Sequence, residues 1–317
     1  MKLSVFNPVL YSLSLEDALK YLQRLGVQAM ELGCGGYPGT THANAEELVK
    51  SPAKVKELKK LFTQYGIAVS ALSVHGNGVH PDKAFAASST AVFRAACQIA
   101  GDLGTDRVVT FSGCPGDGKS EQPNWITCTW PPEFYKTLEY QWNDILIPYW
   151  QKEGEFAEKH GIKVALEMHP GFCVYNAPTM LRLRKAAGDA IGANLDPSHL
   201  IWQGADIVSV VKALADAIHF FHCKDTAINR DIKMCEGVLD TKPYARELDR
   251  AWLFRTVGYG DCDWKGVISA LRMVGYDHAL SIEHEDSLMP PVEGLEKAVK
   301  YLQSIMIYDA AGTEAWW

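Results

Sequence analysis

The segment Gly161–Pro170, GIKVALEMHP, contains the pattern that decides the fold. A glycine ends a long segment of helical periodicity, and the next residues, Lys163–Glu167, predict a short buried strand. The strand ends on Glu167, and the imidazole of His169 follows two residues later. A helix that ends at glycine and leads into a buried strand is typical of a parallel α/β sheet. The same order of glycine, branched residue and strand occurs at Gly26-Val27 and Gly66-Ile67.

Short apolar runs alternate with helical segments along the whole chain. The apolar runs predict eight buried strands, at Leu3–Asn7, Ala29–Gly33, Ala68–Val74, Arg107–Phe111, Lys163–Glu167, Gly192–Asp196, Ile218–His222 and Ala279–Glu283. The helical periodicity predicts helices at Leu15–Leu25, Ala45–Tyr65, Ala84–Leu103, Pro132–His160, Thr179–Ala187, Asp206–Ala215, Trp264–Val274 and Val292–Ile307. This alternation predicts a (β/α)₈ TIM barrel that forms a single domain over residues 1–317.

A doubly wound open sheet is the alternative architecture for the same alternation. Such sheets usually carry a glycine-rich first turn, whereas the first turn here reads Phe6-Asn7-Pro8-Val9 and has no G-x-G-x-x-G pattern. The barrel is therefore favoured. Two long connections, at 112–131 and 225–261, follow the fourth and seventh predicted strands. In a barrel both would lie over the active-site mouth.

The composition excludes several classes of function. The 317 residues are 47% hydrophobic and carry a net charge of −7 without a basic block, which argues against nucleic-acid binding. No apolar run approaches the roughly 18 residues of a membrane span, and the first residues lack the pattern of a signal peptide. The eight cysteines contain no C-x-x-C pair and are expected to be reduced thiols. We therefore expect a cytoplasmic protein without nucleic-acid or membrane partners.

Polar residues stand at the predicted carboxyl ends of the strands, where barrel enzymes place their active sites. They are Glu31, His75, Glu167, His169, Asp196, His199, His222, Lys224 and Glu283. Any one acid could pair with a lysine or an arginine. However, several carboxylates buried together are costly unless a cation neutralises them.

Glu167, Asp196, His222 and Glu283 fall on four successive predicted strands, five to eight. Three carboxylates and one imidazole suit one octahedral divalent metal with two positions left for substrate oxygens. We expect Mn²⁺, with Mg²⁺ or Co²⁺ as alternatives. Zn²⁺ is less favoured because the set has one histidine and no thiolate.

Four motifs resemble the xylose-isomerase-like TIM barrels, and more closely their sugar phosphate isomerase/epimerase group. They are Leu166–Pro170 (LEMHP), Asn194–His199 (NLDPSH), His222–Thr226 (HCKDT) and Ser281–Glu285 (SIEHE). The resemblance implies that the four residues above bind metal, that Glu167 and Glu283 also transfer protons, and that His199 contacts a substrate oxygen. The stretch Phe254–Gly260 resembles a loop that supplies an arginine, here Arg255, to the substrate. Glu31, His75 and Lys224 are further expected substrate contacts, although Lys224 could equally hold a neighbouring carboxylate.

His169 departs from the pattern of true xylose isomerases, which have a lysine at this position. The resemblance therefore argues against isomerisation by a hydride shift, and a neutral imidazole here is a third candidate for proton transfer. Some barrels of this superfamily act instead on 3-oxo-glycosides, from which they expel the aglycone. Some of those require a small β-rich partner subunit.

The expected function is that of a metal-dependent sugar isomerase or epimerase. The shared step is removal of a proton next to a metal-bound carbonyl, through a cis-enediolate. The alternative is a lyase or deglycosidase that acts on 3-oxo-glycosides, and the third possibility is a non-catalytic sugar-binding barrel. We expect a sugar or glycoside as the small-molecule partner. The terminal Trp316 and Trp317 either fold back over the floor of the barrel or the last helix, or they indicate a homo-oligomer or a small partner subunit, because exposed tryptophans often anchor interfaces.

Overall fold

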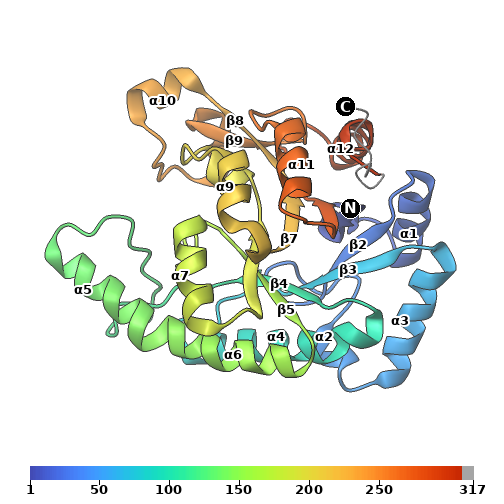
Figure 1. Ribbon diagram of the computed structural model, residues 1–317, viewed down its shortest axis with the longest axis horizontal. Helices are drawn as coiled ribbons and strands as arrows, with labels where there is room; N and C mark the ends of the chain where they lie inside the picture. Colours follow the sequence, from blue (N-terminus) through green and yellow to red (C-terminus); the bar gives the residue numbers. More distant parts are fainter. Residues whose placement is uncertain (309–317) are drawn as a thin grey trace, which may run out of the picture.

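Eight parallel strands close into a barrel in the computed structural model, which describes residues 1–308 (Figure 1). Around the barrel the strands are hydrogen-bonded in the order β1-β10-β7-β6-β5-β4-β3-β2. Their bounds are β1 Lys2–Phe6, β2 Ala29–Gly33, β3 Ala68–Ser73, β4 Arg107–Phe111, β5 Lys163–Glu167, β6 Ile191–Leu195, β7 Ile218–Cys223 and β10 Ala279–Ile282. The predicted (β/α)₈ TIM barrel is confirmed.

The helices lie outside the strands and cover them (Figure 1). Their bounds are α1 Leu15–Arg24, α2 Ala45–Leu48, α3 Pro52–Tyr65, α4 Lys83–Leu103, α5 Pro132–Tyr140, α6 Ile147–Lys159, α7 Ala177–Ala187, α8 Ser198–Ile201, α9 Ile207–Leu214, α10 Arg230–Glu236, α11 Trp264–Met273 and α12 Pro291–Ile305. Short 3₁₀ segments occupy η1 Asn7–Leu10, η3 Ala215–Ala217 and η4 Tyr244–Asp249. No helix among residues 1–308 is both long and apolar enough to cross a bilayer.

Two apolar layers hold the barrel together. The larger core lies between strands and helices and includes Leu19 of α1, Phe93 of α4 and Leu295 of α12. A small cluster from the other face of the strands contains Ala71, Val109, Ala165, Phe220 and Ala279. Because alternate residues of a strand point to opposite faces, these short apolar strands supply both layers at once.

The predicted helix at 45–65 is wrong in one respect, because the structure divides it into α2 and α3. Pro52 has no N–H group, so it cannot continue a helix that arrives from its N-terminal side. The backbone of Ser51 is non-helical, and its hydroxyl caps α3 by accepting a hydrogen bond from the Lys54 N–H group. The predicted helix at 132–160 is likewise interrupted by a π-helical segment, η2 Gln141–Leu146, shortly before Pro148.

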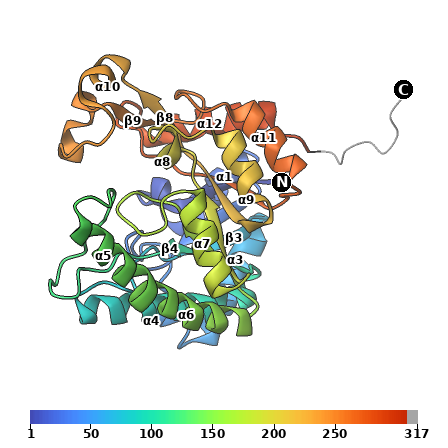
Figure 2. The ribbon, with the colours of Figure 1, turned by 60° about the vertical axis from the view of Figure 1, so that its left-hand side comes forward.

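The connection at 225–261, predicted as a long loop, is also partly wrong. It contains an antiparallel ribbon of β8 Asp225–Ile228 and β9 Trp252–Arg255, with α10 between them. Ribbon and helix project from the barrel as a lobe above α5 (Figure 2). The ribbon is stabilised by its own apolar cluster, made of Trp202, Ala251, Trp252 and Phe254. We name residues 225–261 the lid.

Asp225 fixes the base of the lid. Its buried carboxylate accepts hydrogen bonds from the N–H groups of Thr226, Cys262 and Gly258 and from the Trp264 indole, at 2.8–3.1 Å. These donors lie on both sides of the lid, so one side chain ties its two ends together. Residues 309–317, on which the predicted self-association contact falls, lie outside the described residues, and that contact stays a prediction.

Replacing Asp225 with alanine should lower the free energy of unfolding by about 3 kcal/mol or more, because four donors, two of them buried and two part-buried, would lose their acceptor. Urea unfolding monitored by circular dichroism measures this change. Asp231→Ala, an exposed aspartate in the same lid, is the matched control and should change it by less than about 1 kcal/mol. Equal effects of the two substitutions would show that Asp225 does not anchor the lid.

Candidate active site and metal centre

The four residues predicted as metal ligands lie together at the carboxyl end of the barrel. Glu167 ends β5, Asp196 follows β6, His222 lies near the end of β7, and Glu283 follows β10. One oxygen or nitrogen atom from each lies within 4.8 Å of the corresponding atoms of the other three. Adjacent parallel strands end on the same side, so residues far apart in the sequence converge here.

Two ligand atoms of this cluster are buried without a hydrogen-bond partner. They are Oδ2 of Asp196 and Nδ1 of His222. The nearest charged groups are Lys224 Nζ, 3.1 Å from Asp196 Oδ2, and Glu283 Oε2, 3.1 Å from His222 Nδ1. Buried polar atoms are rarely left unsatisfied. A divalent cation would satisfy both, and the mixed oxygen and nitrogen donor set fits such an ion.

Glu31 orients His222 toward the cluster. Its two carboxylate oxygens lie 3.0 and 2.9 Å from His222 Nε2, and the same oxygens accept hydrogen bonds from the hydroxyls of Ser73 and Ser281. The pKa of His222 is lowered by burial, but the charges of Glu31 and Glu283 outweigh that effect and raise it well above its usual value. With Nε2 held by Glu31, Nδ1 is the nitrogen presented to the cluster. Glu31, predicted as a substrate contact, is therefore placed behind His222.

Glu167 is held by polar groups on three sides. Its Oε2 lies 2.9 Å from His75 Nε2 and accepts a hydrogen bond from Asn194 Nδ2 at 3.2 Å, while Oε1 lies 3.1 Å from His199 Nε2. Burial raises the pKa of Glu167, but the hydrogen bonds from His199 and His75 outweigh it and hold the pKa well below the usual range. Glu167 is thus an ionised carboxylate in a fixed orientation.

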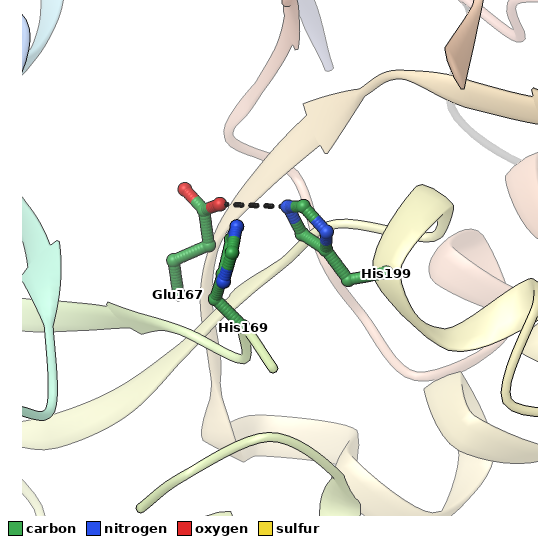
Figure 3. Close-up of side chains that lie close together, drawn as sticks. All are labelled: Glu167, His169 and His199. Atoms are coloured by element: carbon green, nitrogen blue, oxygen red, sulfur yellow. Dashed lines mark hydrogen bonds and ion pairs between the residues drawn. The ribbon is translucent and has the colours of Figure 1, made fainter. Parts of the chain in front are cut away.

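His169 and His199 form a pair of imidazoles beside Glu167 (Figure 3). Their ring centroids are 4.0 Å apart, and burial lowers the pKa of both. Nδ1 of His169 donates to the Pro170 carbonyl at 2.5 Å, since a carbonyl only accepts. In the neutral ring Nε2 therefore carries the lone pair. His169 is a half-buried neutral imidazole, the form that a general base requires.

Lys224 is a buried ammonium within the acidic cluster. Its side chain is 2% exposed, and Nζ lies 2.8 Å from Glu283 Oε2 and 3.2 Å from Glu285 Oε2. Burial lowers the pKa of Lys224, but the surrounding carboxylates raise it well above its usual value. The pKa of Asp196 is also raised, which for a carboxyl group favours the neutral form. Burial, together with the charges of Glu283 and Glu167, raises its pKa to about 7.

A cavity of about 260 Å³ opens onto these groups, and we name it the first cavity. Its lining includes the predicted residues His75, Glu167, His169, Lys224 and Glu283. It also includes Phe6, Tyr37, Phe111 and Glu285, which the sequence analysis did not single out as site residues. Glu285 belongs to the SIEHE motif, and Asn194 is a polar residue within a buried strand. Both could therefore have been predicted as site residues from the sequence. The aromatic residues could not, because they look like ordinary core.

Arg255 is placed differently from the other predicted site residues. It lies at the end of β9 in the lid, where its Nε contacts Asp286 Oδ2 at 3.1 Å. Arg255 does not line the first cavity. Its predicted contact with substrate stays a prediction.

Comparison with known proteins agrees with this architecture. The family model for the xylose isomerase-like TIM barrel matches residues 19–305. The chain is 38% identical over 309 residues to the uncharacterized protein YfiH of Bacillus subtilis strain 168, and the match covers 96% of this chain and 98% of that protein. It is 24% identical over 277 residues to an inosose dehydratase of Geobacillus thermodenitrificans strain NG80-2, covering 86% and 87% of the two chains.

Among solved structures, the 3-keto-D-glucoside 4-epimerase YcjR of E. coli has the same fold. It superposes with a TM-score of 0.67 at 13% identity, over 96% of this chain and 99% of that one. The family match spans nearly all the strands and helices that build the barrel and its site. The chain belongs to the xylose isomerase-like TIM barrel family.

Proposed function

We propose that this protein is a metal-dependent enzyme that removes a proton next to the ketone of a sugar or a related ring polyol. The observation that carries the proposal is the buried cluster of Glu167, Asp196, His222 and Glu283, which opens onto a cavity that a neutral imidazole also lines. A barrel that only bound sugars would have no reason to bury four metal-type ligands together. Return of a proton to the same carbon from the other face gives an epimer, and return to the former carbonyl carbon gives an isomer.

The four cluster residues would hold the cation. Carboxylate oxygens with a single imidazole favour Mn²⁺, with Mg²⁺ and Co²⁺ as alternatives. A divalent cation, when bound, polarises the substrate carbonyl and so acidifies the neighbouring C–H bond. Lys224 neutralises Asp196 and Glu283 at the edge of the same cluster.

Three side chains at the cavity can move the proton. Glu167 and Glu283 are both ionised. Burial raises the pKa of each, but hydrogen bonds from His199 and His75 outweigh it at Glu167. At Glu283 the charges of Lys224 and His222 outweigh it and lower the pKa. We assign them as the base and its partner. His169 Nε2 is the third candidate, because its lone pair is free and the ring lines the cavity.

Elimination is the second candidate outcome. Once the proton next to a ketone has been removed, a group on the next carbon can depart. The matched relative named inosose dehydratase and the fold relative named 3-keto-D-glucoside 4-epimerase are both named for ketones of polyhydroxylated rings. One relative is named for loss of water and the other for epimerisation, and both outcomes can begin with the same proton removal.

A substrate screen in D₂O with added Mn²⁺ tests the proposal. Ketoses, inososes and 3-oxo-glycosides would be followed by NMR, and at least one class should take up deuterium at the carbon next to the carbonyl. The product would distinguish an epimer from an unsaturated ketone. Absence of exchange in every class, with metal bound, would contradict the proposal.

Glu167→Gln and Glu283→Gln should each lower that exchange rate by about 10²-fold or more, because each removes a carboxylate base. Metal content must be measured in parallel, since both residues also belong to the cluster. His160→Ala, at an exposed imidazole directly after the end of α6, is the control for the weaker candidate His169→Ala. If both glutamine variants keep metal and the full rate, the assignment is wrong and His169 takes their place.

Glu31→Gln should weaken Mn²⁺ binding by about 10–100-fold, because the carboxylate that orients His222 is lost. Titration calorimetry measures the affinity. Glu153→Gln removes a carboxylate that is equally buried but pairs with Arg94 in the helical layer, and it should leave metal affinity unchanged. A Glu31 variant with normal metal affinity and a raised KM would instead support the predicted substrate contact.

Metal affinity should rise with pH across the neutral range. In the metal-free protein the pKa of Asp196 is raised to about 7 and that of His222 is also raised, so both hold protons below neutrality. Both groups must be deprotonated to bind a cation, so protons compete with metal as the pH falls. For each proton that the metal displaces, the metal affinity should rise about tenfold per pH unit. Calorimetry from pH 6 to pH 8 should show this gain together with proton release, and a flat profile would contradict it.

A further inference from the structure

A second cavity, of about 290 Å³, adjoins the candidate active site. His169 lines both cavities, and His199 beside it lines the second. Trp202, which follows α8, forms part of the wall, and most of the rest comes from the two long connections. Trp125 belongs to the connection after β4, and the lid contributes Val238–Lys242 and Trp252. The second cavity therefore lies between the lid and the barrel and meets the first cavity at a residue that can transfer protons.

Indole rings form much of the wall of the second cavity and are held in place. Trp202 and Trp252 stack with ring centroids 4.7 Å apart and an interplanar angle of 3°. Trp125 packs edge-on against Tyr175, at 5.5 Å and 85°. Because these rings already hold one another, a ligand would meet a preformed aromatic surface. Such a surface suits the flat apolar face of a ring.

The charged side chains that line the second cavity interact with other groups of the protein. Lys242 pairs with Glu236 and Asp240, and Arg250 lies over the Trp252 ring with its guanidinium carbon 4.3 Å from the centroid. Arg250 Nε also lies 4.0 Å from Asp240 Oδ2. A phosphate group would need unmatched positive charge. The pairing favours an uncharged ligand group.

Each cavity is slightly smaller than the range of about 300–1,000 Å³ that is usual for small-molecule sites. Each is therefore suited to one ring rather than to a whole two-ring ligand.

We propose that the second cavity binds a second uncharged ring, joined through a glycosidic oxygen to the ketone-bearing ring in the first cavity. This inference rests on the proposed function and specifies its substrate class as ketone-bearing glycosides. An aryl group and a second pyranose share the apolar face that indoles bind. The test therefore includes one probe of each kind.

Titration calorimetry on the full chain with added Mn²⁺ would compare three probes: methyl 3-oxo-β-D-glucoside, phenyl 3-oxo-β-D-glucoside and 3-oxo-cellobiose. At least one two-ring probe should bind about tenfold more tightly than the methyl probe, since an aromatic surface contributes on that scale. A tighter phenyl probe identifies an aryl group as the occupant, and a tighter disaccharide identifies a sugar. Equal affinities for all three probes would overturn the proposal.

Trp125→Ala should reduce the two-ring preference to less than about threefold, because it removes one face of the second cavity. Trp130→Ala is the matched control. This tryptophan lies in the same connection, is 73% exposed and lines neither cavity, so its loss should leave the preference intact. Circular dichroism checks that each variant is folded. A second variant, Thr241→Trp, places an indole in the cavity from the exposed side of the lid and should also abolish the preference.

The two proposals fail in different ways. A two-ring preference that Trp125→Ala removes, without deuterium exchange in any ketone, would overturn the proposed function and leave the ring-binding site standing. Deuterium exchange with no preference, or with a preference that survives both Trp125→Ala and Thr241→Trp, would overturn the ring-binding site alone.

Discussion

Buried negative charge at the mouth of the barrel is the constraint on which the rest of the site depends. Glu31, Glu167, Asp196 and Glu283 lie close to one imidazole, His222, and buried carboxylates repel one another strongly. Burial raises the pKa of Asp196 to about 7, and the charges of Glu283 and Glu167 add to that rise. Lys224 compensates part of this negative charge, and Glu31 fixes the orientation of the His222 ring. Asp196 Oδ2 and His222 Nδ1 still lack a hydrogen-bond partner, and a divalent cation would supply one ligand contact to each.

Most of the barrel follows from the sequence because its signals are local. A strand such as β5 needs only a run of apolar residues and a glycine that ends the preceding helix, and its predicted bounds agree with those observed. The metal-type cluster follows as well, because the ends of parallel strands necessarily meet. Where an observed helix differs from the predicted one, the difference arises from the backbone of a residue within that helix. Pro52 interrupts a continuous apolar period that by itself indicates one helix.

The remaining features depend on partners that are distant in the sequence. Glu31 and His222 are separated by 191 positions, and no periodicity links them, so Glu31 looked like an independent polar residue at the mouth. The lid ribbon likewise depends on packing between Trp202 and Trp252 and on the carboxylate of Asp225, which binds donors from both ends of the lid. Polar segments of this length look like loops until the tertiary contacts that order them are known.

The loop that carries His169 is held in place independently of the lid. The Cys173 N–H group donates to the Gly113 carbonyl, the Val174 N–H group donates to the Ser112 hydroxyl, and Phe172 stacks on Phe111 at 4.2 Å. These contacts fix the loop to β4 and its connection, so neither the metal-type cluster nor the lid is needed to place His169. If His169 is the base, as one of the three proposed candidates, it would need no reorganisation when substrate arrives. Changes at the tip of the lid would therefore leave His169 in place, whereas Phe254 at its base contacts both His199 and Lys224.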